Sequence, residues 1–230
     1  MALYAIADLH LSLGSDKPMD DFQGWHGYVE RLTANWKERI TDEDVVVIAG
    51  DISWGMSLKE ALEDFRFLQS LPGKKLLLKG NHDYWWETRR KMDRFFEENG
   101  LHSLCVVHND CYDLGDGRAV CGTRGWFYDA EADADKKILN REIGRLTMSV
   151  QAARDKGLEP IVFLHYPPVY AGTVCEDMMR ALVTLRINRC YYGHIHGRNA
   201  ISKAFNGQYN GVSLQLISGD SLQFAPLFVL

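Results

Sequence analysis

The feature that most constrains the fold is an alternation of short apolar runs with longer amphipathic stretches. The runs LYAIAD at 3–8 and VVVIAGD at 45–51 are apolar up to a terminal aspartate, as expected of strands buried on both faces. Similar runs occupy residues 74–80, 118–126, 161–168, 189–197 and 212–220. Helical patterns cover about 25–39, 57–70, 84–99, 138–156 and 175–186. This alternation predicts an α/β layered sandwich.

The chain shows no internal linker, fixed-period repeat or low-complexity tract. Its 230 residues are enough to bury a substantial core, and we expect a single domain spanning residues 1–230. Two polar segments, 12–24 and the acidic stretch 128–136, are expected to form loops that could border a site. Ser57 and Glu60 form a capping-box pattern that predicts the start of the helix at 57–70.

The charge of the chain limits the classes of partner. The net charge of -5 leaves no basic footprint for nucleic acid or an anionic membrane. Bound metal ions can add local positive charge, so this argument disfavours nucleic acid as a partner without ruling it out. No apolar run approaches the 18 or so residues that a membrane helix needs, and the N-terminus lacks the basic region of a signal peptide.

The cysteines indicate a reducing compartment. Their number is odd, and they form no C-x-x-C pair. They are Cys105, Cys111, Cys121, Cys175 and Cys190. Unpaired thiols of this kind are typical of cytosolic proteins, and we therefore expect a cytoplasmic location.

Polar side chains follow five of the predicted strands. They are Asp8 and His10, then Asp51, then Asn81, His82 and Asp83, then His165, and finally His194 and His196. Ligands of open α/β sheets bind beyond the carboxyl ends of the strands, so these groups are expected to gather at one edge. On an extended chain, residues two apart point to the same side, which lets each D-x-H or H-x-H pair present two ligands to one point.

The chemistry of this set favours metal ions. Carboxylate, amide and imidazole ligands without thiolate suit divalent Mn, Fe, Zn, Ni or Co. The groups are too many for one tetrahedral ion and about right for two ions that share a carboxylate. An Asp at a strand end is most often a turn or cap residue, and a lone His is most often structural. Five of the eight histidines fall at strand ends in these pairings, which favours a metal site over these separate structural roles.

The order of these motifs resembles that of the calcineurin-like metallophosphoesterase superfamily. The motifs read DLH at 8–10, GD at 50–51, GNHD at 80–83, HYPP at 165–168 and GHIH at 193–196. They span most of the chain and occur without a gap. The resemblance implies a four-layer αββα sandwich with two mixed β-sheets. It also implies a binuclear metal centre and hydrolysis of a phosphomonoester or phosphodiester in a small molecule or nucleotide.

The resemblance also assigns roles to the matched positions. Asp51 would bridge both ions. The other ligands would be Asp8, His10 and His196 for one ion, and Asn81, His165 and His194 for the second. His82 would be the catalytic histidine, and Asp83 would orient its imidazole and favour its charged form.

These roles fit the demands of the reaction. A phosphate ester resists hydrolysis because its negative charge repels hydroxide and its alkoxide is a poor leaving group. Two ions about 3.5–4 Å apart hold a hydroxide and clamp the phosphoryl oxygens for in-line attack. The leaving oxygen still needs a proton, and an imidazole can supply one near neutral pH.

Differences from the motifs of protein phosphatases in the superfamily limit the classes of substrate. Protein serine/threonine phosphatases of the superfamily resemble GDxVDRG and RGNHE, whereas this chain has GDISWG at 50–55 and KGNHD at 79–83. The missing arginines disfavour a protein phosphatase. Alternatives are a nuclease or nucleotide-pyrophosphate hydrolase, or a non-catalytic interaction module. Trp54 is a candidate to line a substrate pocket, and Arg124 is a candidate to bind a phosphate bidentately.

Overall fold

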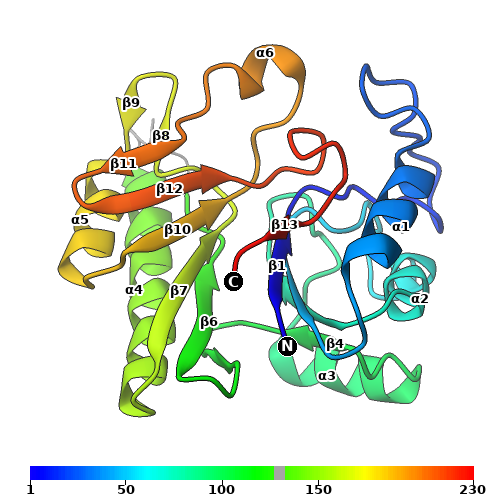
Figure 1. Ribbon diagram of the computed structural model, residues 1–230, viewed down its shortest axis with the longest axis horizontal. Coiled ribbons are helices and arrows are strands. Elements are labelled where there is room, and N and C mark those ends of the chain that lie inside the picture. The colour runs from blue at the N-terminus through cyan, green and yellow to red at the C-terminus, as the bar shows by residue number, and fades with distance from the viewer. Residues whose placement is uncertain (127–132) are drawn as a thin grey trace.

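The computed structural model describes residues 1–126 and 133–230, and it shows two β-sheets packed face to face with helices outside (Figure 1). The first sheet has the strand order β13-β1-β2-β3-β4. Four of its strands are parallel: β1 (Leu3–Ile6), β2 (Val45–Ala49), β3 (Lys74–Leu78) and β4 (Leu104–Val106). The edge strand β13 (Leu227–Phe228) is antiparallel. The helices beside this sheet are α1 (Tyr28–Arg39), α2 (Leu62–Ser70) and α3 (Arg89–Glu98).

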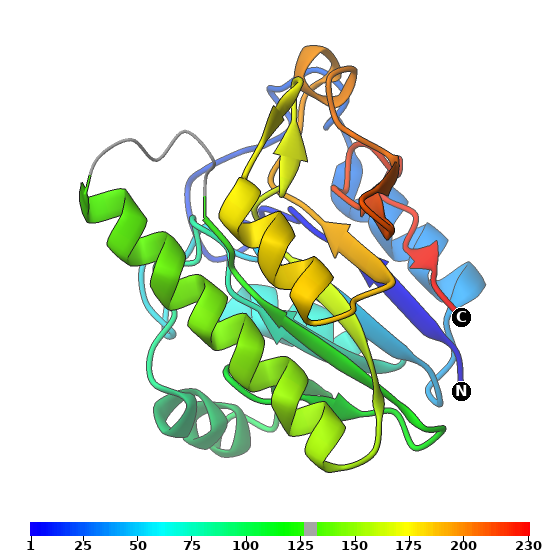
Figure 2. The same ribbon diagram turned by 90° about the vertical axis from the view of Figure 1, so that its left-hand side faces the viewer.

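The second sheet has the order β11-β12-β10-β7-β6-β5. Its parallel strands are β6 (Arg118–Thr123), β7 (Glu159–Leu164), β10 (Arg189–Tyr192) and β12 (Val212–Leu216). Both edges are antiparallel, formed by β5 (Tyr112–Asp113) and β11 (Gly207–Tyr209). Helices α4 (Asp133–Asp155) and α5 (Glu176–Thr184) lie side by side on its outer face (Figure 2). A hairpin of β8 (Val169–Tyr170) and β9 (Thr173–Val174), and the short α6 (Arg198–Ile201), complete the fold.

Alternating side chains of the central strands pack into two different hydrophobic cores. In β2, Val45 and Val47 pack between the two sheets, whereas Val46 and Ile48 pack against the helices of the first layer. The strands of the second sheet divide in the same way between the middle core and the α4–α5 layer. Both faces are therefore buried, which explains the continuous apolar runs and confirms the predicted four-layer αββα sandwich with two mixed sheets.

The two sheets meet just beyond β1 and β12. The amide of Ala7 donates to the carbonyl of Ile217 (2.8 Å), and the amide of Gly219 donates to the carbonyl of Ala7 (2.8 Å). This junction brings the carboxyl ends of strands from both sheets to the same end of the sandwich, in the upper part of Figure 1. Polar residues that follow the strands can therefore meet although they come from different sheets.

The helix starts differ from the sequence prediction. The helix expected at 57–70 begins at Leu62, and the Ser57 hydroxyl accepts the Glu60 amide (3.3 Å) in the turn before it. The helix expected at 84–99 begins at Arg89. Residues 133–136, expected in a loop, belong to α4, while 128–132 lie outside the described residues. Within residues 1–126 and 133–230, no helix has the length and apolar character needed to cross a membrane.

Candidate metal centre

The predicted ligands stand directly after strands of both sheets. Asp8, Asp51 and Asn81 follow β1, β2 and β3 of the first sheet, and His165 and His194 follow β7 and β10 of the second. The sheet junction at Ala7 brings these five positions together. The strand-end rule therefore places the polar set correctly at one end of the sandwich.

The backbone at this end is strained. Four non-glycine residues adopt a left-handed conformation: Asp8 (φ 56°), His10 (φ 45°), Asp51 (φ 52°) and His194 (φ 72°). Each such residue costs roughly 1–3 kcal/mol and persists only where its surroundings hold it. Here the Asp8 amide donates to the Gly50 carbonyl (3.0 Å), and the His10 amide donates to the Asp51 carbonyl (2.9 Å). The structure thus holds four predicted ligands in an unfavourable backbone geometry, which indicates a functional constraint.

Glycines precede the ligands because side chains would not fit there. A Cβ on Gly80 would lie 2.1 Å from Asp51 Oδ1, and one on Gly193 would lie 2.7 Å from Asp8 Oδ2. On Gly193 it would also lie 2.5 Å from the Ala7 Cβ, at the sheet junction. The glycines of the GN and GH motifs are therefore required by close packing against carboxylates of the neighbouring strands.

Asp8, His10 and Asp51 form a first buried cluster. One ligand atom from each lies within 4.8 Å of the others. His10 Nε2 and Asp51 Oδ2 are 3.7 Å apart, and both are buried without a hydrogen-bond partner in the described structure. Burial, followed by the effect of His196, lowers the pKa of His10 well below its usual value, so its ring is neutral. Two orphaned polar atoms that face one point are the arrangement a bound cation would satisfy.

A second cluster consists of Asp51, His165 and His194. His165 Nδ1 lies 3.1 Å from the Ala49 carbonyl and donates to it, which leaves Nε2 with a lone pair. That Nε2 lies 2.7 Å from Asn81 Oδ1, and His194 Nδ1 lies 2.9 Å from the same oxygen. Burial lowers the pKa of His165 to about 3, so its ring is neutral. Two lone pairs at 2.7 Å repel each other, and a cation bound by both would remove that repulsion.

The electrostatics of the carboxylates point the same way. Burial raises the pKa of Asp51 to about 6. Burial, with the Asp51 carboxylate second, also raises the pKa of Asp8 well above its usual value. No lysine or arginine of the described residues forms an ion pair with either carboxyl, and divalent ions would supply the missing positive charge. The two clusters share Asp51, so the residues present fit a pair of ions.

His196 stands apart from both clusters. Its ring is exposed and lies 5.1 Å, centroid to centroid, from the ring of His10. It belongs to neither group of converging ligand atoms in the described residues, so its predicted ligand role stays a prediction. Asp220, which the sequence analysis did not single out, accepts the Gly197 amide (2.6 Å) through Oδ2, while its buried Oδ1 has no partner in the described structure. The available signal was the SGD that ends the last predicted strand run.

His82 faces the open side of the centre. Its amide donates to Asp51 Oδ1 (2.8 Å), and its ring lies 4.6 Å from the ring of Trp54 and 5.7 Å from that of His10. His82 Nδ1 is buried and has no hydrogen-bond partner in the described structure. The structure therefore brings His82 beside the first cluster, as the sequence predicts, with no carboxylate bound to its ring.

Asp83 has different partners from those expected. Its Oδ2 accepts the amides of Asp51 (2.9 Å) and Gly80 (2.7 Å), and its Oδ1 accepts the Ile52 amide (2.8 Å) and Trp85 Nε1 (3.0 Å). Burial and then the Asp51 carboxylate raise the pKa of Asp83 to about 7, and these donors oppose the rise. The expected orientation of His82 by Asp83 is not observed, because both carboxylate oxygens are occupied in joining the β2 and β3 ends.

The two candidate substrate residues differ in position. Trp54 stacks on His10 (centroids 4.9 Å apart, 26° between planes), as expected of a residue at the site. Arg124 lies over the Trp126 ring (4.7 Å), and its Nη2 is 3.8 Å from the buried carboxylate of Glu142. Arg124 Nε is buried without a hydrogen-bond partner in the described structure, so the guanidinium is only partly satisfied, and phosphate binding by Arg124 stays a prediction.

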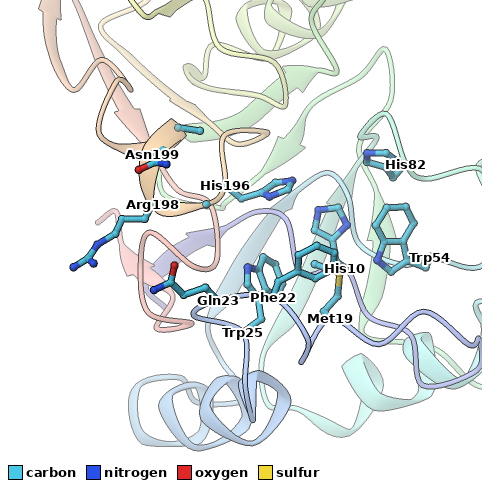
Figure 3. Close-up of a pocket in the computed structure, with 12 residues that line it drawn as sticks. His10, Met19, Phe22, Gln23, Trp25, Trp54, His82, His196, Arg198 and Asn199 are labelled. Atoms are coloured by element: carbon cyan, nitrogen blue, oxygen red, sulfur yellow. The ribbon is translucent and has the colours of Figure 1, made fainter.

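A cavity of about 570 Å³ opens beside the first cluster (Figure 3). Three imidazoles and Trp54 line the side nearest the candidate ligands, and apolar, amide and guanidinium side chains line the remainder. Its lining includes His10, His82, His196, Trp54, Trp25, Met19, Phe22, Gln23, Arg198 and Asn199. A cavity of this size with convergent polar groups is typical of a ligand site.

A family model described as calcineurin-like phosphoesterase matches residues 1–198, most of the chain. The chain belongs to this family. It is accordingly a hydrolase that acts on phosphoester bonds, and the family uses a binuclear divalent metal centre. The two clusters that share Asp51 are the groups in this chain that could hold such ions.

Solved structures with the same fold are distant in sequence. The chain is similar to the AQ665 protein of Aquifex aeolicus, with a TM-score of 0.52, 15% identity, and coverage of 98% of this chain and 94% of that one. It is also similar to phosphopantetheinyl hydrolase (PptH) of Mycobacterium tuberculosis, with a TM-score of 0.51, 14% identity, and coverage of 100% of this chain and 95% of that one. For TT1561 of Thermus thermophilus, the TM-score is 0.55 and the identity 12%, with coverage of 85% of this chain and 82% of that one. At these identities the likeness shows the fold alone.

A nearer relative in sequence covers only part of the chain. The Gene 66 protein of Mycobacterium phage D29 is 39% identical over 79 residues. That match spans 34% of this chain and 38% of the phage protein, well under two thirds of its length.

Proposed function

We propose that this chain hydrolyses a phosphomonoester or phosphodiester at a binuclear metal centre, with His82 protonating the leaving oxygen. The observation that carries the proposal is the pair of buried ligand clusters that share Asp51. In the first cluster His10 Nε2 and Asp51 Oδ2 are buried without a hydrogen-bond partner in the described structure, and in the second His165 Nε2 lies 2.7 Å from Asn81 Oδ1; divalent cations would satisfy these atoms.

We assign Asp51 as the shared ligand of both ions. Asp8, His10 and His196 are proposed for one ion, and Asn81, His165 and His194 for the other. When bound, the ions would supply a nucleophile at neutral pH and clamp the phosphoryl oxygens. The nitrogen and oxygen donors, without thiolate, suit Mn, Fe, Zn, Ni or Co.

The protein's own contribution to the chemistry centres on His82. The hydrogen bond from the His82 backbone amide to Asp51 Oδ1 links the position of His82 to the proposed shared ligand. The His82 ring lines the cavity. An imidazole there can deliver a proton to an oxygen that leaves toward the cavity. In this proposal Asp83 acts as a positioning residue, because its carboxylate secures the amides of Asp51 and Gly80.

The substrate class, the domain and the cellular location are proposed from the sequence. We propose a phosphorylated small molecule or nucleotide as the substrate, in one phosphoesterase domain over residues 1–230. All five cysteines are free thiols, which supports a reducing compartment, and we propose the cytoplasm.

Metal content and turnover together test the proposal. Elemental analysis of the Mn²⁺-loaded wild type should give about two ions per chain, and Asp51→Asn should lower the content at both sites while the fold persists. His82→Ala should keep both ions and lose turnover chiefly on esters with poor leaving groups.

Contrary outcomes separate the two assignments. Normal two-ion occupancy in Asp51→Asn would remove Asp51 as the shared ligand. An equal loss in His82→Ala on activated aryl esters and on alkyl esters would remove His82 as the general acid. A metal-free and inactive wild type after Mn²⁺ loading would favour the interaction-module alternative.

A further inference from the structure

The cavity beside the first cluster is elongated, and its two ends differ chemically. His82 and Trp54 stand at one end, His10 and Phe22 lie in the middle, and Arg198 stands at the far end (Figure 3). The volume of about 570 Å³ lies within the range of roughly 300–1,000 Å³ that is typical of small-molecule sites. A phosphoryl group at the metal end fills a small part of this space, so the cavity has room for a large organic substituent.

Phe22 offers the free aromatic face of the cavity. The Trp54 ring stacks on the His10 ring, and the Lys17 ammonium lies 4.5 Å from the Trp54 ring centroid. The faces of Trp54 are therefore already in contact with other side chains. Trp25 is 2% exposed and packs edge-on against neighbouring rings, Phe224 among them. Phe22 is 59% exposed, and no ring of the described residues packs on it. A planar group in the cavity can therefore stack on Phe22.

The far end presents polar side chains without partners of their own. The side chains of Gln23, Arg198 and Asn199 make no hydrogen bond or ion pair with the described part of the chain. Each amide offers a donor and an acceptor in one plane, and the guanidinium offers several donors. Side-chain amides of this kind bind the edge of an adenine bidentately. All three side chains are exposed, so water binds them when the cavity is empty. A wholly apolar tail would displace this water without replacing its hydrogen bonds, whereas a heteroaromatic ring with polar edges can replace them.

We propose that this cavity binds the leaving group of the substrate, and that this group is a nucleoside. The inference rests on the proposed function, because it is His82, at the metal end of the cavity, that would protonate the departing oxygen. The reaction consumes one water, which supplies the new oxygen on phosphorus. The bond between phosphorus and the nucleoside oxygen breaks, that oxygen keeps the electron pair and takes a proton from His82, and water's proton restores His82. Phe22 and Gln23 are then specificity-determining residues on the 12–24 loop.

The test compares adenosine 5′-phosphate with methyl phosphate on the Mn²⁺-loaded full chain. Wild type should show a kcat/KM for the nucleotide at least tenfold above that for methyl phosphate. Stacking of a base on an aromatic ring is typically worth a factor of about five to 160, so Phe22→Ala should lower this ratio at least fivefold. Phe228→Ala is the matched control, because Phe228 is 60% exposed and lies on β13, outside the cavity lining.

Direct binding separates this inference from the proposed function. Equilibrium dialysis should show that adenosine binds wild type and Phe228→Ala equally, and Phe22→Ala at least fivefold more weakly. Adenosine binding of this pattern without hydrolysis of any ester would keep the nucleoside site and refute the phosphoesterase proposal. Equal kcat/KM for the two esters, an unchanged ratio in Phe22→Ala, or a preference for a long-chain alkyl phosphate would overturn the nucleoside assignment.

Discussion

Replacing Asp83 with asparagine tests whether this carboxylate holds the centre together. The carboxylate accepts two amides on Oδ2, from Asp51 and Gly80, and further donors on Oδ1. Asparagine keeps one acceptor oxygen and sets an NH₂ group against the two remaining amides. A buried donor left without a partner costs about 1–3 kcal/mol. We therefore expect Asp83→Asn to lower the free energy of unfolding by roughly 2–6 kcal/mol.

The same substitution should reduce metal binding. The displaced amides belong to Asp51, the proposed shared ligand, and to Gly80, which packs directly against it. Urea denaturation would measure the loss of stability, and elemental analysis after Mn²⁺ loading would show fewer than two ions per chain. Asp44→Asn is the matched control. The Asp44 carboxylate accepts the amides of Ala2 (2.7 Å) and Thr41 (2.9 Å) at the opposite end of β2. It should lose stability and keep its metal content.

A different result would restore the role that the sequence first indicates. If Asp83→Asn unfolds like wild type, binds two ions and loses turnover only on poor leaving groups, then Asp83 acts through the His82 imidazole. The structural assignment of Asp83 to the β2 and β3 ends would then be refuted.

The remaining predictions concern packing and charge. Gly80→Ala should lower the free energy of unfolding by about 3 kcal/mol or more, because its Cβ would lie 2.1 Å from Asp51 Oδ1. Gly144→Ala should raise it by about 1 kcal/mol, because this exposed position in α4 has nothing within 4 Å; urea titrations that show equal effects at the two sites would contradict the packing argument. Burial lowers the pKa of Lys75 to about 8, so above that pH the unfolded chain binds more protons than the folded one. Between pH 8 and 10.5, the free energy of unfolding of wild type should therefore rise by up to about 3 kcal/mol relative to that of Lys75→Met. A difference between the two proteins that does not change with pH in urea titrations would refute this.

The sequence predicted the central strands well and the edge strands poorly. Runs such as VVVIA in β2 are apolar on both faces, and that pattern depends only on local residues. Strand β13 has two residues, and it exists because Phe228 pairs with Tyr4 across almost the whole chain. Pairing at that distance leaves no local pattern, so β13 could not be predicted.

The helix that follows β3 shows how a tertiary contact overrides a local signal. The sequence from Tyr84 onward reads as helical, yet α3 begins only at Arg89. The Trp85 indole donates to Asp83 Oδ1, and the Trp86 amide donates to the Asp83 carbonyl (3.2 Å). These bonds keep the segment in a turn, because the buried Asp83 carboxylate takes its position from the ends of β2 and β3.

The positions of the candidate site residues were predictable where they follow strands, and the contacts of their side chains were predictable only in part. Asp83 and its neighbours make this clear. Asn81, His82 and Asp83 are consecutive, but their side chains point in three different directions. Asn81 Oδ1 faces His165 and His194. His82 lines the cavity, and Asp83 is buried against backbone amides. The motif shows that three polar residues stand together there. It does not show the amides that Asp83 binds, because every residue except proline carries one and the sequence does not say which are exposed at a strand end. The adjacency of the three residues therefore follows from one tight turn that supplies a proposed ligand, a cavity residue and its own anchor.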